Sequence, residues 1–227
     1  MDQYIELLKD CAIFSGLPNA VLEKEILPLG RIQENAKGSY LIRFQDTCSY
    51  FGIILTGKVS MMHIYGNGNY GIIGILEDRD LFGADIACTR NGTSPYYAVA
   101  MQYTRVLLFP VSMVWKQGVL MDATRNHILQ NLLLFIADEN IRKEYRIAIL
   151  LQKGLRDRIT TFLMMQAKKR GSDTFTIPFT RGELASYLCV NRSCLSHELS
   201  LMQQEGLILF DRNTFTLLNR MEDDGEY

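Results

Sequence analysis

Residues 180–208 read TRGELASYLCVNRSCLSHELSLMQQEGLI, and this stretch predicts two short amphipathic helices joined by a tight turn. Thr180, with Glu183 three residues later, forms a capping-box pattern for the first helix. Asn191 is placed to cap the second helix with its side-chain oxygen, and Gly206 can end that helix. Apolar side chains recur at helical spacing in both helices, at Leu184, Ala185, Leu188, Leu195, Leu199 and Met202.

The first turn of the second helix carries the polar side chains that a helix-turn-helix uses to read the major groove. Arg192 can form a bidentate pair with guanine, and His197 can donate to a guanine acceptor or to phosphate. The two serines can bond either bases or phosphates and so carry weak sequence information. Other residues are expected to hold phosphates and so to set the register on the duplex. The predicted DNA-binding residues are Thr180, Arg181, Arg192, Ser193, Ser196, His197 and Arg212. The competing interpretation, a surface helix pair in an ordinary α-helical domain, does not account for caps, turn and polar tip together.

Composition restricts the class of protein. The chain has 227 residues, 48% of them hydrophobic, which is enough for a packed core, and a net charge of −1. Residues 151–220 hold ten basic and six acidic side chains, a net charge of +4 that suits phosphate binding. No apolar run reaches about 18 residues, so we expect no membrane span. The N-terminus lacks a signal-peptide pattern, and five irregularly spaced cysteines favour the reducing cytoplasm over a disulfide framework.

The pattern along the chain predicts an α+β protein with an N-terminal antiparallel β-roll, a cupin-like jelly roll. Short β-rich runs at 39–44, 51–55, 58–65, 70–76, 96–101 and 105–110 alternate with glycine turns. After the helix-turn-helix, two further short runs around Asp211-Arg212-Asn213 predict a β-hairpin wing. We expect a β-roll effector-sensing domain at 1–121, a dimerisation helix at 122–150, a winged helix-turn-helix domain at 151–220 and an acidic disordered tail at 221–227.

The 122–150 helix carries a stripe with alternating spacings of four and three residues, which is typical of a coiled-coil seam with a polar centre. The stripe consists of Leu129, Leu133, Ile136, Asn140, Lys143, Ile147 and Leu150. A symmetric dimer would need such a seam, because paired half-sites on DNA require a two-fold axis. The alternative is a single helix packed on its own β-roll.

The order of these parts, and several local motifs, resemble the Crp/Fnr family of bacterial transcription regulators. The motifs are the start at Leu7–Pro18, Lys37-Gly38, IILTGKV at 53–59, DLFG at 80–83 and IPFTR at 177–181. The resemblance covers nearly the whole chain. It implies a homodimer that binds a palindromic operator in double-stranded DNA and is controlled by a small-molecule effector, with RNA polymerase as a candidate further partner.

The departures from the family pattern concern the effector. Members that bind cyclic AMP carry Gly-Glu and, about ten residues later, Arg-Ser. Here Gly83 is followed by Ala84 and Asp85, and residues 93–98 read TSPYYA, without an arginine in register. A buried phosphate without a cation is costly, so we expect no cyclic AMP binding. By family geometry, the candidate effector-binding residues are Tyr96, Tyr97, Asn140 and Lys143.

Other cofactors and activities lack support in the sequence. Cys11, Cys48 and Cys88 do not supply an iron–sulfur cluster, and His63 and His127 are interpreted as structural rather than as haem ligands. We predict no cofactor, no metal site, no catalytic residues and no enzymatic activity. Two alternatives to an effector-controlled regulator stay open: a regulator responding to thiol oxidation at Cys189 and Cys194, and a module whose helix-turn-helix binds protein instead of DNA.

Overall fold

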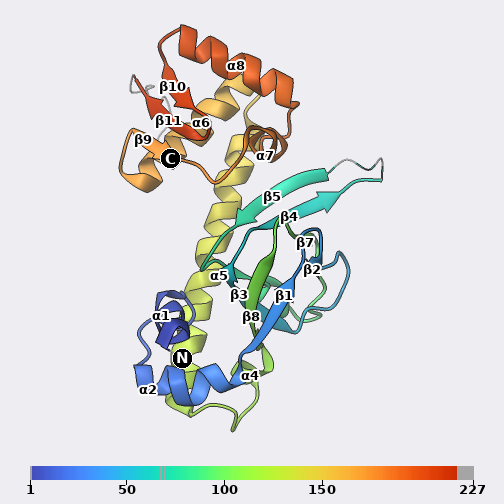
Figure 1. Ribbon diagram of the computed structural model, residues 1–227, viewed down its shortest axis with the longest axis vertical. Helices are drawn as coiled ribbons and strands as arrows, with labels where there is room; N and C mark the ends of the chain where they lie inside the picture. Colours follow the sequence, from blue (N-terminus) through green and yellow to red (C-terminus); the bar gives the residue numbers. More distant parts are fainter. Residues whose placement is uncertain (1, 67, 69, 219–227) are drawn as a thin grey trace. The chain divides into compact units, whose positions relative to one another are not determined.

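The computed structural model describes residues 2–66, 68 and 70–218 (Figure 1). The chain divides into two compact units. The first comprises residues 1–69 and 73–141, and the second comprises residues 70–72 and 142–227. The boundary falls inside the long helix, between Ile141 and Arg142, and not at either end of it. The acidic tail expected at 221–227 lies outside the described residues.

Two four-stranded antiparallel sheets form the β-roll, which confirms the predicted fold class. One sheet has the order β1-β8-β3-β6 and the other β2-β7-β4-β5. The strands are β1 (Arg31–Asn35), β2 (Tyr40–Ile42), β3 (Tyr50–Thr56), β4 (Val59–Ile64), β5 (Tyr70–Leu76), β6 (Leu81–Phe82), β7 (Tyr97–Ala100) and β8 (Thr104–Pro110). β1 and β6 were missed by the sequence pattern, because β1 is mostly polar and exposed and β6 has only two residues.

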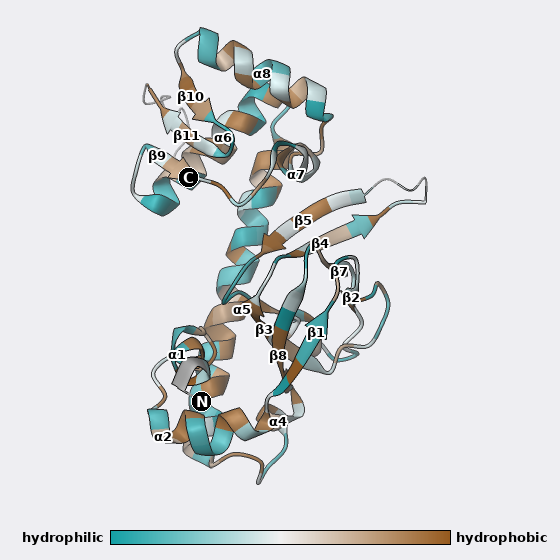
Figure 2. Cartoon of the chain, in the orientation of Figure 1, coloured by the Kyte–Doolittle hydropathy of each residue, from teal (hydrophilic) through white to brown (hydrophobic). Residues whose placement is uncertain are grey.

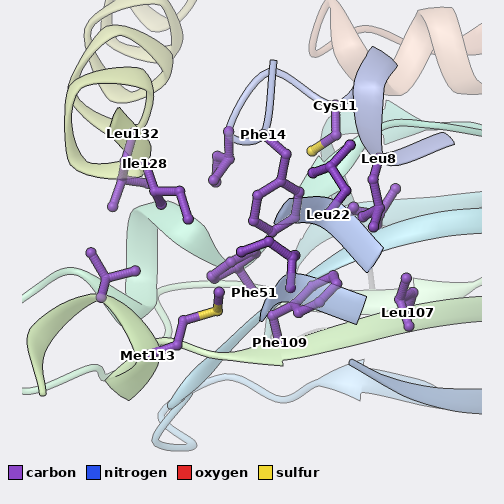
Figure 3. Close-up of a cluster of buried hydrophobic side chains, with 14 of the residues drawn as sticks. Leu8, Cys11, Phe14, Leu22, Phe51, Leu107, Phe109, Met113, Ile128 and Leu132 are labelled. Carbon is purple, nitrogen blue, oxygen red and sulfur yellow. The ribbon is translucent and has the colours of Figure 1, made fainter. Parts of the chain in front are cut away.

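The core of the first unit is built around three phenylalanine rings (Figure 3). Phe14 meets Phe109 edge to face with ring centroids 5.1 Å apart, and Phe51 stacks on Phe109 at 5.6 Å. Ile128 and Leu132 of the long helix belong to the same buried cluster. The short helices of this unit are α1 (Asp2–Asp10), α2 (Asn19–Val21), η1 (Leu22–Ile26), η2 (Leu27–Leu29), α3 (Ala84–Ala87) and α4 (Ser112–Trp115).

Helix α5 (Asp122–Leu151) begins under a cap from a distant part of the chain. Glu25 accepts hydrogen bonds from the backbone N–H of Met121 (3.1 Å) and the hydroxyl of Thr124 (3.4 Å). These contacts satisfy donors that the first turn of a helix leaves free. Further along the helix, His127 Nε2 hydrogen-bonds to the carbonyl of Ser15 at 2.7 Å, consistent with a structural histidine.

Two members of the seam predicted on α5, Leu129 and Ile136, are half-buried and pack against the core of the first unit. Leu133 is 70% exposed. The other large apolar side chains that α5 leaves exposed are Leu134, Ile141, Tyr145, Ile147 and Leu151.

The second unit holds the predicted winged helix-turn-helix. Its elements are α6 (Leu155–Arg170), β9 (Thr174–Thr176), α7 (Arg181–Tyr187), α8 (Arg192–Gln204), β10 (Ile208–Asp211) and β11 (Thr214–Leu217). The predicted wing hairpin is confirmed, and β9 adds a third strand in the order β10-β11-β9. The sequence pattern does not predict β9, because its three residues place exposed threonines on either side of a single buried Phe175. Within the part of the chain that the structure describes, no helix combines the length and apolarity needed to cross a membrane.

Candidate nucleic-acid interface

The first helix of the motif, α7, starts at the predicted capping box. The backbone N–H of Glu183 donates to Thr180 Oγ1 at 3.4 Å, and the N–H of Thr180 donates to Glu183 Oε2 at 2.6 Å. Both bonds satisfy orphan donors at the helix start. The hydroxyl proton of Thr180 stays available to a phosphate oxygen.

The turn between α7 and α8 is a Schellman motif with a cysteine at its left-handed position. Val190 N donates to Ala185 O at 2.9 Å, and Cys189 N donates to Ser186 O at 3.2 Å. Cys189 has φ of 57°, a conformation in which glycine is favoured. The turn therefore stores backbone strain at an exposed thiol.

Helix α8 shows the expected division into a buried and an exposed face, visible as brown and teal segments of its ribbon in Figure 2. Leu195, Leu199 and Met202 are fully buried. The predicted side-chain cap is wrong: Asn191 makes no side-chain cap bond, and only its backbone carbonyl accepts from Leu195 N at 3.0 Å. The exposed side chains of the first turns include Arg192, Ser193 and His197, whereas Ser196 is half-buried.

A bidentate ion pair that sequence reasoning missed fixes α8 on α6. Arg156 donates through Nε to Glu198 (2.6 Å) and through both terminal nitrogens to Glu205 (2.7 and 2.9 Å). Its hydrogen bonds to Glu205 and Glu198 raise the pKa of Arg156. The partners lie 42 and 49 positions away, so no local pattern signals the contact.

Arg181 connects the start of α7 to the wing. Its guanidinium lies 4.7 Å from the ring centroid of Phe210 and 5.6 Å from that of Phe215, and it donates to the carbonyl of Arg212 at 3.2 Å. Burial and the nearby positive charge of Arg192 lower the pKa of Arg181. Two guanidinium groups close enough to repel each other form a positive field that a phosphate would neutralise.

The wing contributes the last predicted contact. Arg212 lies in the turn between β10 and β11, with φ of 53° and an exposed side chain. Its carbonyl is held by Arg181, so the turn and the start of α7 are fixed relative to each other. The structure thus gathers Arg181, Arg192 and Arg212 within one unit.

Of the four candidate effector residues, Tyr96 and Tyr97 do not share a face of the β-roll. Tyr96 is buried in the roll, where its hydroxyl donates to Asp85 Oδ1 at 3.1 Å. Burial, with Asp85 as the next contribution, raises the pKa of Tyr96. Tyr97 is the first residue of β7, where it pairs with Met62 on the face opposite to the buried Ala98. Asn140 belongs to the first unit and Lys143 to the second, and both are exposed.

The segment around Gly83, where the resemblance implies a cyclic-nucleotide phosphate, makes contacts within the chain itself. Gly83, with φ of 78°, precedes α3, and Asp85 on that helix receives the Tyr96 hydroxyl. Ser94 is buried and donates to the carbonyl of Tyr96 at 2.7 Å. Across residues 2–66, 68 and 70–218, no three His, Cys, Asp or Glu side chains are grouped to hold a metal ion.

Two family models match the chain. The cyclic nucleotide-binding domain matches residues 32–117, and the Crp-like helix-turn-helix domain matches residues 157–222. The transcriptional activator protein FnrA of Stutzerimonas stutzeri is 26% identical over 212 residues, covering 88% of this chain and 84% of the relative.

Solved structures agree with the fold. FixK2 from Bradyrhizobium japonicum is 20% identical, with a TM-score of 0.66, over 84% of this chain and 93% of that one. The c-di-GMP responsive global regulator CLP of Xanthomonas campestris is 15% identical, with a TM-score of 0.67, over 88% of this chain and 99% of that one. The β-roll, the winged helix-turn-helix and both matching domains together identify the chain as a transcription regulator of the Crp/Fnr family.

Proposed function

We propose that the protein is a homodimer that binds a palindromic operator and changes its affinity for that operator when an effector occupies the β-roll. The observation that carries the DNA part is the set of exposed polar side chains on the first turns of α8, together with Arg181, whose guanidinium is held against the wing by Phe210 and the carbonyl of Arg212. A regulator of genes must reach the chromosome, so the proposal also places the protein in the cytoplasm.

Each DNA contact has a chemical role. Arg192 reads guanine, His197 donates to a base acceptor or to phosphate, and Ser193 and Ser196 add weak hydrogen bonds. Thr180, Arg181 and Arg212 bind phosphates. The phosphate-binding role of Arg181 is supported by its contact with the Phe210 ring of the wing, because a side chain already fixed by packing loses little conformational entropy on binding.

The apolar side chains that α5 exposes support the dimer. Leu133 and Leu151 are 70% and 76% exposed. A single apolar side chain on a protein surface is normal, whereas several on one helix favour burial against a partner. A second copy of α5 would cover them and provide the two-fold axis that paired half-sites need. RNA polymerase stays a candidate further partner.

The effector is proposed to differ from cyclic AMP. Ser94 and Tyr96 are buried and bonded within the roll at the place where relatives that bind cyclic AMP carry a phosphate-binding arginine. No cation of that segment is in register to neutralise a buried phosphate. Calorimetric titration with cyclic AMP should show no binding, and a micromolar dissociation constant would contradict this part.

The experiment for the DNA part starts with a selection from a randomised duplex library using the full chain. The expected result is an enriched palindrome with half-sites about one helical turn apart. On that duplex, Arg192→Ala should weaken binding about tenfold to a hundredfold, while Arg181→Ala should also reduce the salt dependence by about one counterion. Lys24→Ala, an exposed cation of the first unit, is the matched control. Failure of the wild-type chain to enrich any sequence would overturn the proposal.

A thiol-controlled regulator is the second candidate, and one observation favours it. Cys189 and Cys194 are both exposed, on either side of the start of α8. Oxidation of Cys189 would enlarge a side chain in a strained turn next to the DNA-reading helix. Mass spectrometry after mild peroxide, combined with DNA binding of Cys189→Ser and Cys194→Ser, distinguishes the two candidates.

A further inference from the structure

An exposed cluster of aromatic side chains lies on the first unit, away from the buried core. Tyr97 lies 5.6 Å from Tyr40 and 6.0 Å from Phe44, measured between ring centroids. The guanidinium of Arg43 lies 4.3 Å from the ring centroid of Tyr40. We call Tyr40, Arg43, Phe44 and Tyr97 the aromatic patch.

Strand register places this patch on the outer face of its sheet. Tyr40 pairs with Val99, which lies two positions after Tyr97 in β7. Side chains two positions apart in a strand, and those of directly paired residues, point to the same face, so Tyr40 and Tyr97 share one face of the sheet. The alternate residues of β7, such as Ala98, belong to the buried cluster inside the roll. The aromatic patch is therefore not part of an internal effector pocket.

The exposure of the rings is more than packing requires. Tyr40 is 38% exposed and Phe44 is 43% exposed, although both touch Tyr97. Rings that served only to stabilise the sheet would gain more by being covered. On the same face of the sheet, Ser60 is fully buried and its Oγ has no hydrogen-bond partner among the described residues. Leaving this hydroxyl unpaired lowers the stability of the sheet.

The segments that contain the aromatic patch carry more basic than acidic side chains. Residues 36–48 and 89–100, which contain β2, β7 and their flanks, hold three basic side chains, Lys37, Arg43 and Arg90, and one acidic side chain, Asp46. Among the described residues, the contact of Arg43 is with the Tyr40 ring and not with a carboxylate. The surface thus combines exposed aromatic rings with a cation available for a carboxylate, in a chain whose net charge is −1.

We propose that the aromatic patch is a docking surface for an acidic segment of a partner protein that also presents an apolar side chain. Tyrosine and arginine are the residue types that dominate binding energy at protein interfaces. The apolar side chain of the partner packs between Tyr40, Tyr97 and Phe44, and a carboxylate pairs with Arg43. This inference goes beyond the proposed function, because DNA reading uses residues of the second unit only.

The test uses the full chain and two labelled twelve-residue peptides, one alternating Glu with Leu and Phe, the other with Lys in place of Glu. In fluorescence anisotropy, the acidic peptide should bind the wild-type protein. Arg43→Glu, which keeps all three rings, and Phe44→Ser, which lies outside the strands, should each weaken that binding at least tenfold. Lys24→Glu makes the same charge change elsewhere on the first unit and should leave it unchanged.

Far-UV circular dichroism and the thermal unfolding midpoint of Arg43→Glu and Phe44→Ser should match those of the wild-type chain, which shows that the first unit is folded in both variants. Equal binding of both peptides, or equal binding of the acidic peptide to all variants, would overturn the proposal. A third result would also overturn it: neither peptide binds, but a planar anion such as AMP or phenylacetate binds the wild-type chain and not Tyr97→Ala. The surface would then bind a small molecule and not a protein segment.

Discussion

Arg156 and Glu198 form a hydrogen-bonded ion pair of 2.6 Å that fastens the DNA-reading helix to α6. The side chain of Glu198 is 19% exposed, so this carboxylate relies on its partner more than a surface acid would. The same guanidinium holds Glu205 through two further bonds. The position of α8 therefore depends on a residue that does not itself face DNA.

Arg156→Ala should lower the free energy of unfolding by on the order of 1 kcal/mol, a modest value because Arg156 is 41% exposed and the pair is screened by solvent. DNA affinity should fall as well, since α8 loses its anchor. Urea unfolding and anisotropy on the selected duplex measure the two effects. Arg156→Lys keeps the charge but not the bidentate geometry, so full rescue by lysine would contradict the geometric explanation.

Cys189→Gly should stabilise the second unit by up to about 1 kcal/mol, because glycine adopts the positive φ of this turn without steric cost. Cys194→Gly makes the same chemical change inside α8 and should instead destabilise by roughly 0.3–0.5 kcal/mol, the difference in helix propensity between cysteine and glycine. Thermal unfolding of the two variants should therefore move the midpoint in opposite directions. Movement in the same direction would show that the cysteine in the turn is not strained.

Gly52→Ala should destabilise the β-roll by about 1–3 kcal/mol through overpacking. A Cβ on Gly52 would lie 2.4 Å from Phe82 Cζ and 2.7 Å from Leu108 Cδ2, both on neighbouring strands. Gly182→Ala is the matched control in α7, where a Cβ meets open space, and it should stabilise by about 0.5–1 kcal/mol. Chemical denaturation gives the unfolding free energy of both variants. Equal changes in that free energy would contradict the overpacking explanation for Gly52.

Alkaline pH should destabilise the protein partly through Cys11. Burial raises the pKa of Cys11 from 9.0 to about 11, so the folded chain keeps a proton that the unfolded chain releases. The contribution to stability is complete below pH 9 and is lost as the pH rises from about 9 to 11, on the order of 3 kcal/mol in total. Cys11→Ala should flatten the pH dependence of the unfolding free energy in this window, and an unchanged slope would contradict the assignment.

The parts that sequence analysis predicted correctly are those whose signals are local. The capping box of Thr180 and Glu183, the buried face of α8 and the wing hairpin each lie within a few residues of their pattern. Asn191 shows the limit of such reasoning, since a residue suited to capping can leave the cap to its backbone.

What could not be predicted depends on residues far apart in the chain. The partners of Arg156 lie more than forty positions away, and Arg181 finds its aromatic partners only once the wing has folded. Tyr96 and Tyr97 are a second example, because Tyr96 precedes β7 and is buried within the roll, whereas Tyr97 begins the strand on its outer face. Two adjacent tyrosines carry no local signal that separates them, and only the start of the strand between them does so.

The cap that Glu25 places on α5 makes the beginning of this helix depend on residues that precede the β-roll. A fragment that starts at β1 would keep every strand of the roll and still leave the Met121 amide and the Thr124 hydroxyl without their acceptor. Its long helix would fray from that end, so any truncation used to isolate the sensor region has to retain residues 19–30.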